Sequence, residues 1–131
     1  MERTRPDLTP SECWELLALS HVGRLALSIQ ALPLILPVRY AVDGTSVIIG
    51  LGKHGLPLVS IDDVIVAFAV DAFDVPAGLG WMVQLQGRTQ LATPGKLSFN
   101  DGPVEHSQVV RLEPGTVTGS RFTFLPSPVS T

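Results

Sequence analysis

The stretch LILPVRYAVDGTSVII, residues 34–49, places two apolar runs on either side of an Asp-Gly pair. In the first run every second residue is large and apolar, which is typical of a strand with one buried face. Asp43-Gly44 between two such runs indicates a two-residue hairpin turn. Residues 34–42 and 46–49 are therefore predicted to pair as antiparallel strands. The residues expected to share the buried face of the first run are Leu34, Leu36, Val38, Tyr40 and Val42.

The segments before this hairpin predict one more strand and a short helix. Residues 24–30 alternate with a period of two, and a tight connection at Gln30-Ala31 joins them to the next strand. Pro33 and Pro37 predict an irregular or edge strand there, because proline cannot donate to a ladder. Thr9-Pro10-Ser11-Glu12 has the pattern of a helix start with a capping box. This helix is expected to end near His21 or Gly23.

The segments after the hairpin also predict strands. Val64–Asp71 is a continuous apolar run, expected to be buried on both faces, and a loop rich in glycine and proline follows at Ala72–Gly80. Residues 81–91 alternate cleanly, with Trp81, Val83, Leu85, Thr89 and Leu91 on one face. Residues 92–107 form a polar connection, and residues 108–112 and 116–118 form the last strand. Short strands joined by hairpins predict a small closed or partly closed antiparallel barrel.

The composition predicts one domain with a subunit interface. The chain has 131 residues, with flexible ends expected at 1–8 and 125–131. Apolar residues make up 45% and charged residues 16%, which argues against disorder. Mean hydropathy is +0.33. A small domain cannot hide this much apolar surface within itself, so we expect a homodimer.

Charge and hydropathy also exclude several classes. The net charge of −3 argues against a nucleic-acid partner. No apolar run approaches the length of a membrane helix, and MERTRPDLTP at the start lacks the apolar segment of a signal peptide. We therefore expect a cytoplasmic protein without membrane contact. The single cysteine, Cys13, excludes an internal disulfide and a multi-thiolate metal site, and the histidines lack ligand spacing.

A glycine-rich segment after the third strand is the first candidate site. GLGKHG, residues 50–55, matches the dinucleotide-binding pattern G-x-G-x-x-G, but Pro57 and the surrounding hairpins disfavour a parallel nucleotide-binding fold. Its backbone N–H groups, with Lys53 and His54, could instead hold an anion. A solvent-exposed turn is the alternative.

Three further side chains stand out from their strands. Arg39 and Arg88 are cations on otherwise uncharged stretches, and each is either an anion or partner contact or a surface cation. Trp81 is expected in the core or at an interface, where an indole can also stack on a planar ring.

Five stretches in order give the chain a resemblance to a known family. They are LTPSECWELLALSHVGRLALS, LPVRYAVDG, VAFAVD, GWMVQLQGRTQL and VVRLEPGTVTGSRF, and they span most of residues 8–122. The chain resembles the pyridoxamine 5′-phosphate oxidase-like family. This implies a mainly β fold: a six-stranded antiparallel split β-barrel with a short N-terminal helix and one or two small helices. It also implies a homodimer with FMN, or in related branches a deazaflavin, in two interface clefts.

The resemblance implies roles for the candidate residues. Lys53 and His54 would meet the flavin phosphate, Arg39 and Trp81 would lie near the ring, and Arg88 would assist. Family members usually carry Gly-Thr/Ser-Lys-Leu in the phosphate loop, and this chain has GLPL at residues 55–58. A basic residue is also common at the end of the third strand, where this chain has Gly50.

Two functions follow from the resemblance and its departures. The first is an FMN-dependent oxidoreductase, a small reductase or oxidase, acting as a homodimer. The second is a split-barrel dimer that has lost FMN and has no redox activity. It would bind another small ligand in the interface cleft, a deazaflavin or a protein partner. Leu56 and Pro57, which replace the usual hydroxyl residue and lysine, favour the second.

Overall fold

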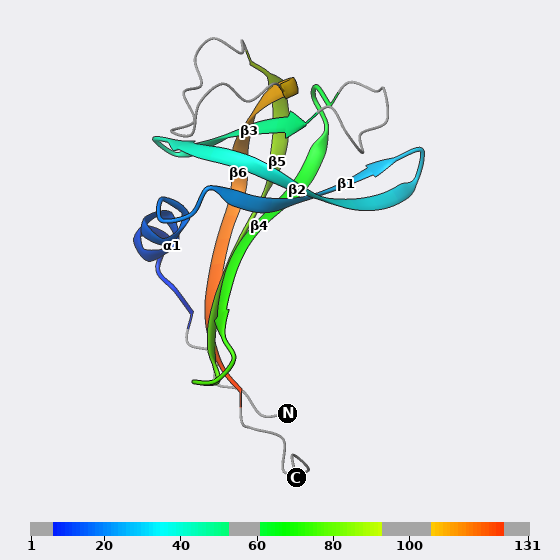
Figure 1. Cartoon of the computed structure of the whole chain (residues 1–131). Coiled ribbons are helices and arrows are strands. Elements are labelled where there is room, and N and C mark those ends of the chain that lie inside the picture. Colours follow the sequence, from blue (N-terminus) through cyan, green and yellow to red (C-terminus); the bar gives the residue numbers. More distant parts are fainter. Residues whose placement is uncertain (1–6, 53–60, 93–105, 125–131) are drawn as a thin grey trace.

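The computed structural model describes residues 7–52, 61–92 and 106–124, and these form one helix and six strands (Figure 1). All strand pairs are antiparallel, and the strands close into a barrel in the order β1-β2-β3-β6-β5-β4. The predicted mainly β, six-stranded antiparallel barrel with an N-terminal helix is confirmed. The elements are α1 Pro10–Leu17, β1 Val22–Ile29, β2 Leu32–Asp43, β3 Ser46–Gly52, β4 Ile65–Asp74, β5 Leu79–Leu91 and β6 His106–Thr123.

The barrel interior is filled by the alternating apolar residues of the strands. Tyr40 is 1% exposed and meets Phe68 edge to face, with ring centroids 5.0 Å apart. Such an aromatic pair adds about 1 kcal/mol beyond the area it buries. The interior also holds aliphatic residues from the other strands, among them Leu25, Ile49, Leu85 and Leu112.

The predicted hairpins are confirmed. Ile29 pairs with Leu32, and both residues between them, Gln30 and Ala31, have positive φ, as a two-residue turn that matches the strand twist requires. Gly44 has φ +62° in the next hairpin, where Asp43 pairs with Ser46. The half of β2 that carries Pro33 and Pro37 pairs with β1 alone among the described strands. The prediction of an edge position for these prolines is therefore confirmed.

The helix begins as predicted and ends earlier than predicted. The Thr9 N–H donates to Glu12 Oε1 at 2.9 Å and the Glu12 N–H donates to Thr9 Oγ1 at 3.2 Å, which forms the capping box. The helix ends at Leu17, not near His21 or Gly23. The backbone tightens after Leu17, where the Leu19 N–H donates to the Leu16 carbonyl, and the buried Tyr40 hydroxyl of β2 donates to the Leu17 carbonyl at 2.5 Å.

The hydroxyl of Tyr40 should titrate far above its usual range. Burial raises the pKa of Tyr40 from 10.0 to about 12. The neutral form is therefore favoured in the folded chain. This preference contributes roughly 2 to 3 kcal/mol to the free energy of unfolding. The contribution is complete below about pH 10 and is lost as the pH rises toward 12. Tyr40 is the single tyrosine of the chain, so tyrosinate absorbance of flavin-free protein measures it alone. A midpoint near pH 10 in the folded protein would contradict this prediction.

Strand β4 differs from the prediction in two ways. Its residues alternate between buried and accessible, and Ile65 is 62% exposed, so the prediction of burial on both faces was wrong. The predicted loop at Ala72–Gly80 was also too long, because β4 runs to Asp74 and β5 begins at Leu79. Together with the end of β6, these residues form three strands that project beyond the barrel (Figure 1). We call Asp71–Asp74, Leu79–Met82 and Ser120–Thr123 the strand extension.

Candidate functional site

Residues 61–64 form a turn that leads into β4. The turn is fastened to β5 by backbone hydrogen bonds in both directions. The Asp63 N–H donates to the Thr89 carbonyl and the Thr89 N–H donates to the Val64 carbonyl, both at 2.9 Å. Asp63 has φ +57°, a conformation that aspartate tolerates better than most residues. The turn is therefore fixed to the end of β5.

Thr89 secures this turn from inside the barrel. Its side chain is fully buried, and Oγ1 donates to the Ile61 carbonyl at 2.5 Å. The same oxygen accepts a hydrogen bond from the Val64 N–H at 3.2 Å. Sequence reasoning placed Thr89 on the inward face of its strand and gave it no function. A buried hydroxyl in an apolar alternation is the signal that could have marked it, since buried polar groups need partners.

Arg88 secures the same turn from outside. Its guanidinium lies 3.1 Å from Asp63 Oδ1 and donates to the Asp63 carbonyl at 3.3 Å. Both side chains are mostly exposed, so the pair contributes little to stability. An exposed guanidinium can exchange such a partner for a more strongly charged anion. The prediction that Arg88 assists at a cofactor site stays a prediction.

Arg39 lies within β2, at a position where the strand pairs with β1 on one side and with β3 on the other. It is half-buried on β2, on the opposite face from Val38 and Tyr40, and its register partner on β3 is Gly50. Gly50 lies two residues before the end of β3 at Gly52. Arg39 and Arg88 therefore flank the two ends of the segment 53–60. The resemblance expects the flavin phosphate at this segment, with Arg39 near the flavin ring and Arg88 assisting.

Lys53 and His54 lie outside the described residues. Trp81 lies within the described residues, but it is not close to Arg88 of the same chain. The two residues are seven positions apart on β5, which places them about 23 Å apart along the strand and on opposite faces. Trp81 instead belongs to the strand extension, where it packs against the core beside α1.

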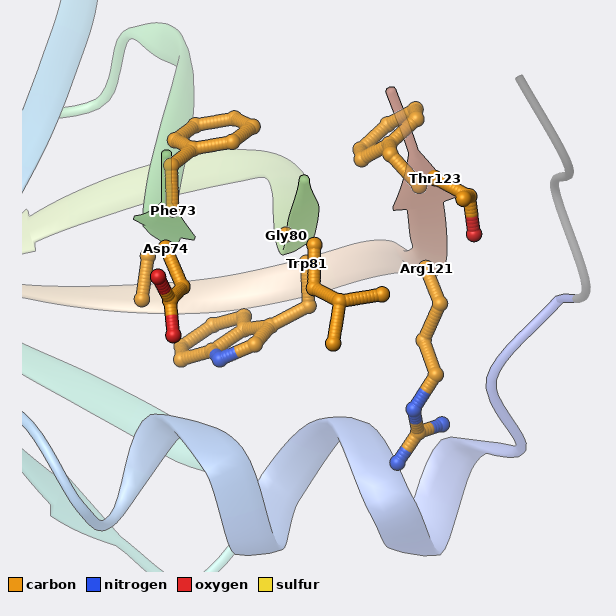
Figure 2. A pocket seen from close by; sticks show the side chains of 9 residues that line it. Phe73, Asp74, Gly80, Trp81, Arg121 and Thr123 are labelled. Atoms are coloured by element: carbon orange, nitrogen blue, oxygen red, sulfur yellow. The ribbon is translucent and has the colours of Figure 1, made fainter. Parts of the chain in front are cut away.

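A cleft of about 480 Å³ lies on the face of the strand extension that turns toward α1 (Figure 2). Trp81 and Arg121 are register partners on β5 and β6, and both point toward α1. Phe73 points to the other face and covers Gly80, where a Cβ atom would overlap its ring. The residues that line the cleft are Ala72, Phe73, Asp74, Leu79, Gly80, Trp81, Arg121, Phe122 and Thr123.

The charged groups of the cleft have partners at its two edges. Arg121 lies 3.7 Å from Glu12 Oε2. Its partner is ionised, because the Thr9 N–H bond holds the pKa of Glu12 below its usual range. Asp74 Oδ1 accepts a hydrogen bond from the Ala77 N–H at 3.1 Å and so closes the β4–β5 turn. Sequence reasoning missed this cleft because it interpreted Ala72–Gly80 as a loop.

Nowhere in 7–52, 61–92 and 106–124 do three or more histidine, cysteine or acidic side chains gather as a metal site would require. Across the same ranges, no helix has the length and apolar character to cross a membrane.

The closed antiparallel barrel of six strands defines a class of small mainly β folds, and comparison with protein-family models places the chain in a family of this class. The model of the pyridoxamine 5′-phosphate oxidase family matches residues 9–121. The chain belongs to this family. Comparison with curated proteins gives no significant match.

Solved structures with the same fold support this assignment. The FAD-binding protein from Mycobacterium smegmatis is 27% identical, with a TM-score of 0.71 over 91% of this chain and 99% of that one. An FAD-binding protein from Mesorhizobium loti is 16% identical, with a TM-score of 0.69 over 93% and 99%. The FAD and heme binding protein from M. smegmatis is 15% identical, with a TM-score of 0.63 over 100% and 77%. The last two likenesses show the fold alone.

Proposed function

We propose that the chain is a flavin-binding protein of the pyridoxamine 5′-phosphate oxidase family that acts as a homodimer and uses FMN in oxidoreductase chemistry. The observation that carries this proposal is the family match over residues 9–121 on a closed barrel. The FAD-binding relative at 27% identity supports a flavin as the cofactor. A bound flavin supplies hydride or electron transfer through its isoalloxazine ring.

The residues of this chain would supply binding and orientation. Arg39 and Arg88 flank the segment 53–60, and Lys53 and His54 lie within it. Lys53 and His54 are proposed to meet the phosphate, which needs several charge-assisted donors, with Arg88 assisting and Arg39 near the ring. Thr89 would position the exit of the segment by holding residues 61–64 against β5. Trp81 can reach the same cofactor only from a second copy of the chain.

A second candidate function is favoured by the sequence of the segment itself. Leu56 and Pro57 stand where family members usually carry a hydroxyl residue and a lysine, and Gly50 replaces a common basic residue. Losing such donors costs about 1.5 to 3 kcal/mol each. On this ground the chain would be a barrel dimer that has lost FMN and takes a deazaflavin, another small ligand or a protein partner.

Lys53→Ala tests the proposed phosphate contact. We expect it to weaken FMN affinity at least about tenfold, which corresponds to about 1.4 kcal/mol. Lys96→Ala, which changes the other lysine of the chain, serves as the control and should leave FMN affinity unchanged. Equal affinities for wild type and Lys53→Ala would remove Lys53 from the site.

Two arginine variants extend this test to described residues. Arg39→Gln and Arg88→Gln should each weaken FMN binding, whereas Arg111→Gln should not, because Arg111 pairs with Asp43 at the end of β3 opposite Gly52. Light scattering tests the homodimer separately. A particle of twice 14.0 kDa is expected, and a mass of 14.0 kDa at micromolar concentration would contradict the proposed dimer.

A further inference from the structure

The first half of β2 is an open sheet edge, on the hairpin that extends away from α1 (Figure 1). Residues 32–37 pair with β1 in a continuous register, and pairing with β3 begins only at Arg39. Among the described strands, none pairs with the other side of residues 32–37. Two apolar side chains of this stretch are exposed, Leu32 at 63% and Ile35 at 71%. An exposed apolar edge of this kind is a template to which a further strand can add.

The register shows which backbone groups of β2 face this open side. The Tyr40 N–H donates to the His21 carbonyl at 3.0 Å, so these two residues form a hydrogen-bonded pair across the β1–β2 ladder. In an antiparallel ladder such pairs alternate with pairs whose N–H and C=O groups point away from the neighbouring strand. Because Tyr40 faces β1, the even-numbered residues before it also face β1, and the odd-numbered residues face the open side. The odd-numbered residues of the open stretch are Pro33, Ile35 and Pro37.

Both prolines of the open stretch stand where a donor to an added strand would otherwise lie. Proline has no backbone N–H, so Pro33 and Pro37 remove two donors from the open side. At an even-numbered position the same residue would have removed a hydrogen bond to β1. The prolines therefore deplete the open edge of donors and leave the ladder to β1 intact. Ile35 supplies the N–H that remains on the open side of residues 33–37.

A second copy of the same edge is the strand that this surface would otherwise accept. An antiparallel pair of edges that is symmetric about Ile35 sets Pro33 of each copy opposite Pro37 of the other. Neither proline can donate, so the hydrogen bonds of both outer pairs are lost. Only the central pair, Ile35 with its own copy, can exchange hydrogen bonds. The exposed Ile35 side chains would favour this pairing, and the two prolines oppose it.

We propose that Pro33 and Pro37 prevent a second copy of the chain from adding to the open edge of β2, and so keep copies from joining edge to edge through this strand. The proposal does not depend on flavin binding. It concerns this edge alone, so it holds for a monomer and equally for a homodimer whose copies meet through another surface.

Amide hydrogen exchange in the wild-type protein, followed by NMR, tests the edge without any substitution. The N–H groups of Leu34 and Leu36 face β1 and should exchange slowly. The N–H of Ile35 lies between them in sequence and faces the open side, so it should exchange much faster than both. Protection of Ile35 equal to that of Leu34 and Leu36 would show that a strand already covers the edge, and would overturn the proposal.

Pro33→Thr/Pro37→Thr tests the role of the prolines themselves. Threonine restores both N–H donors and is common in strands. The mass of this double variant by light scattering should rise with protein concentration to at least twice the mass of wild type, which should stay constant. Adding Ile35→Lys places two like charges opposite each other in the central pair, so it should return the variant to the wild-type mass.

A matched control separates the edge from the general loss of a proline. Pro76→Thr changes an exposed proline of the β4–β5 turn and should leave the mass at the wild-type value. A double variant that keeps the near-ultraviolet circular dichroism of wild type and also keeps its mass at high concentration would overturn the proposal. Association that Ile35→Lys does not reverse would overturn it too, because the contact would then lie elsewhere. If the double variant does not fold, the exchange of Ile35 in the wild type decides between the two outcomes.

Discussion

Gly87→Ala should destabilise the protein by about 3 kcal/mol, because no space exists for a single added methyl group. A Cβ atom at Gly87 would overlap the Glu113 carbonyl oxygen and lie 2.9 Å from Pro114 Cα. Both are backbone atoms, so neither can rotate away as a side chain would. The register between β5 and β6 shifts at this point, and the added methyl would force the two strands apart.

Gly115→Ala is the matched control for this prediction. Gly115 lies in the same irregularity of β6, and the nearest atom to its added Cβ would be the Gln86 carbonyl oxygen at 3.7 Å. Urea unfolding should therefore show a large loss of stability for Gly87→Ala and a loss below about 1 kcal/mol for Gly115→Ala. Similar losses for both variants would show that the backbone contact at Gly87 does not determine the effect.

Thr89→Val should also cost about 3 kcal/mol and should weaken flavin binding. The substitution keeps the shape of the side chain and removes the hydroxyl that holds the Ile61 carbonyl and the Val64 N–H. Each buried group left without a partner costs about 1 to 3 kcal/mol. Residues 61–64 directly follow the segment that is proposed to hold the phosphate. The loss of the Thr89 hydrogen bonds should therefore also weaken flavin binding.

The comparison with Thr89→Ser separates the hydroxyl from the packing. Serine keeps the donor and acceptor and loses a buried methyl group, so a cost of about 1 kcal/mol is expected. Urea unfolding gives the stability of each variant, and titration under strongly native conditions gives its FMN affinity. If Thr89→Ser and Thr89→Val lose equal stability, the hydrogen bonds to residues 61 and 64 do not secure the turn.

The barrel could be predicted from the sequence because its signals are local. Alternation in residues 34–42 and 81–91, the Asp43-Gly44 pair and the capping box at Thr9 each act over a few residues. These signals predicted the strand faces and the hairpins correctly. The early end of the helix could not be predicted in the same way. At that end the Leu17 carbonyl accepts a hydrogen bond from Tyr40, 23 positions away, and no local pattern indicates this contact.

The site depends on contacts between strands that local patterns do not show. Gly80 appeared to belong to a loop, but it lies within β5, where it pairs with Phe73 of the neighbouring strand and the Phe73 ring covers it. The cleft beside Trp81 follows from that pairing. The partners of Arg88 and Thr89 lie 25 and 28 residues away, so the anchored turn became visible only with the register of the barrel.

Titration of the purified protein with FMN, followed by visible absorbance, tests the central claim most directly. We predict saturable binding at micromolar FMN, with one flavin for each chain, or a purified protein that already carries the yellow cofactor. Parallel titrations with FAD and a deazaflavin identify which flavin the site prefers. A colourless protein that shows no spectral change with any of the three would contradict the account, and it would favour the barrel dimer without a flavin.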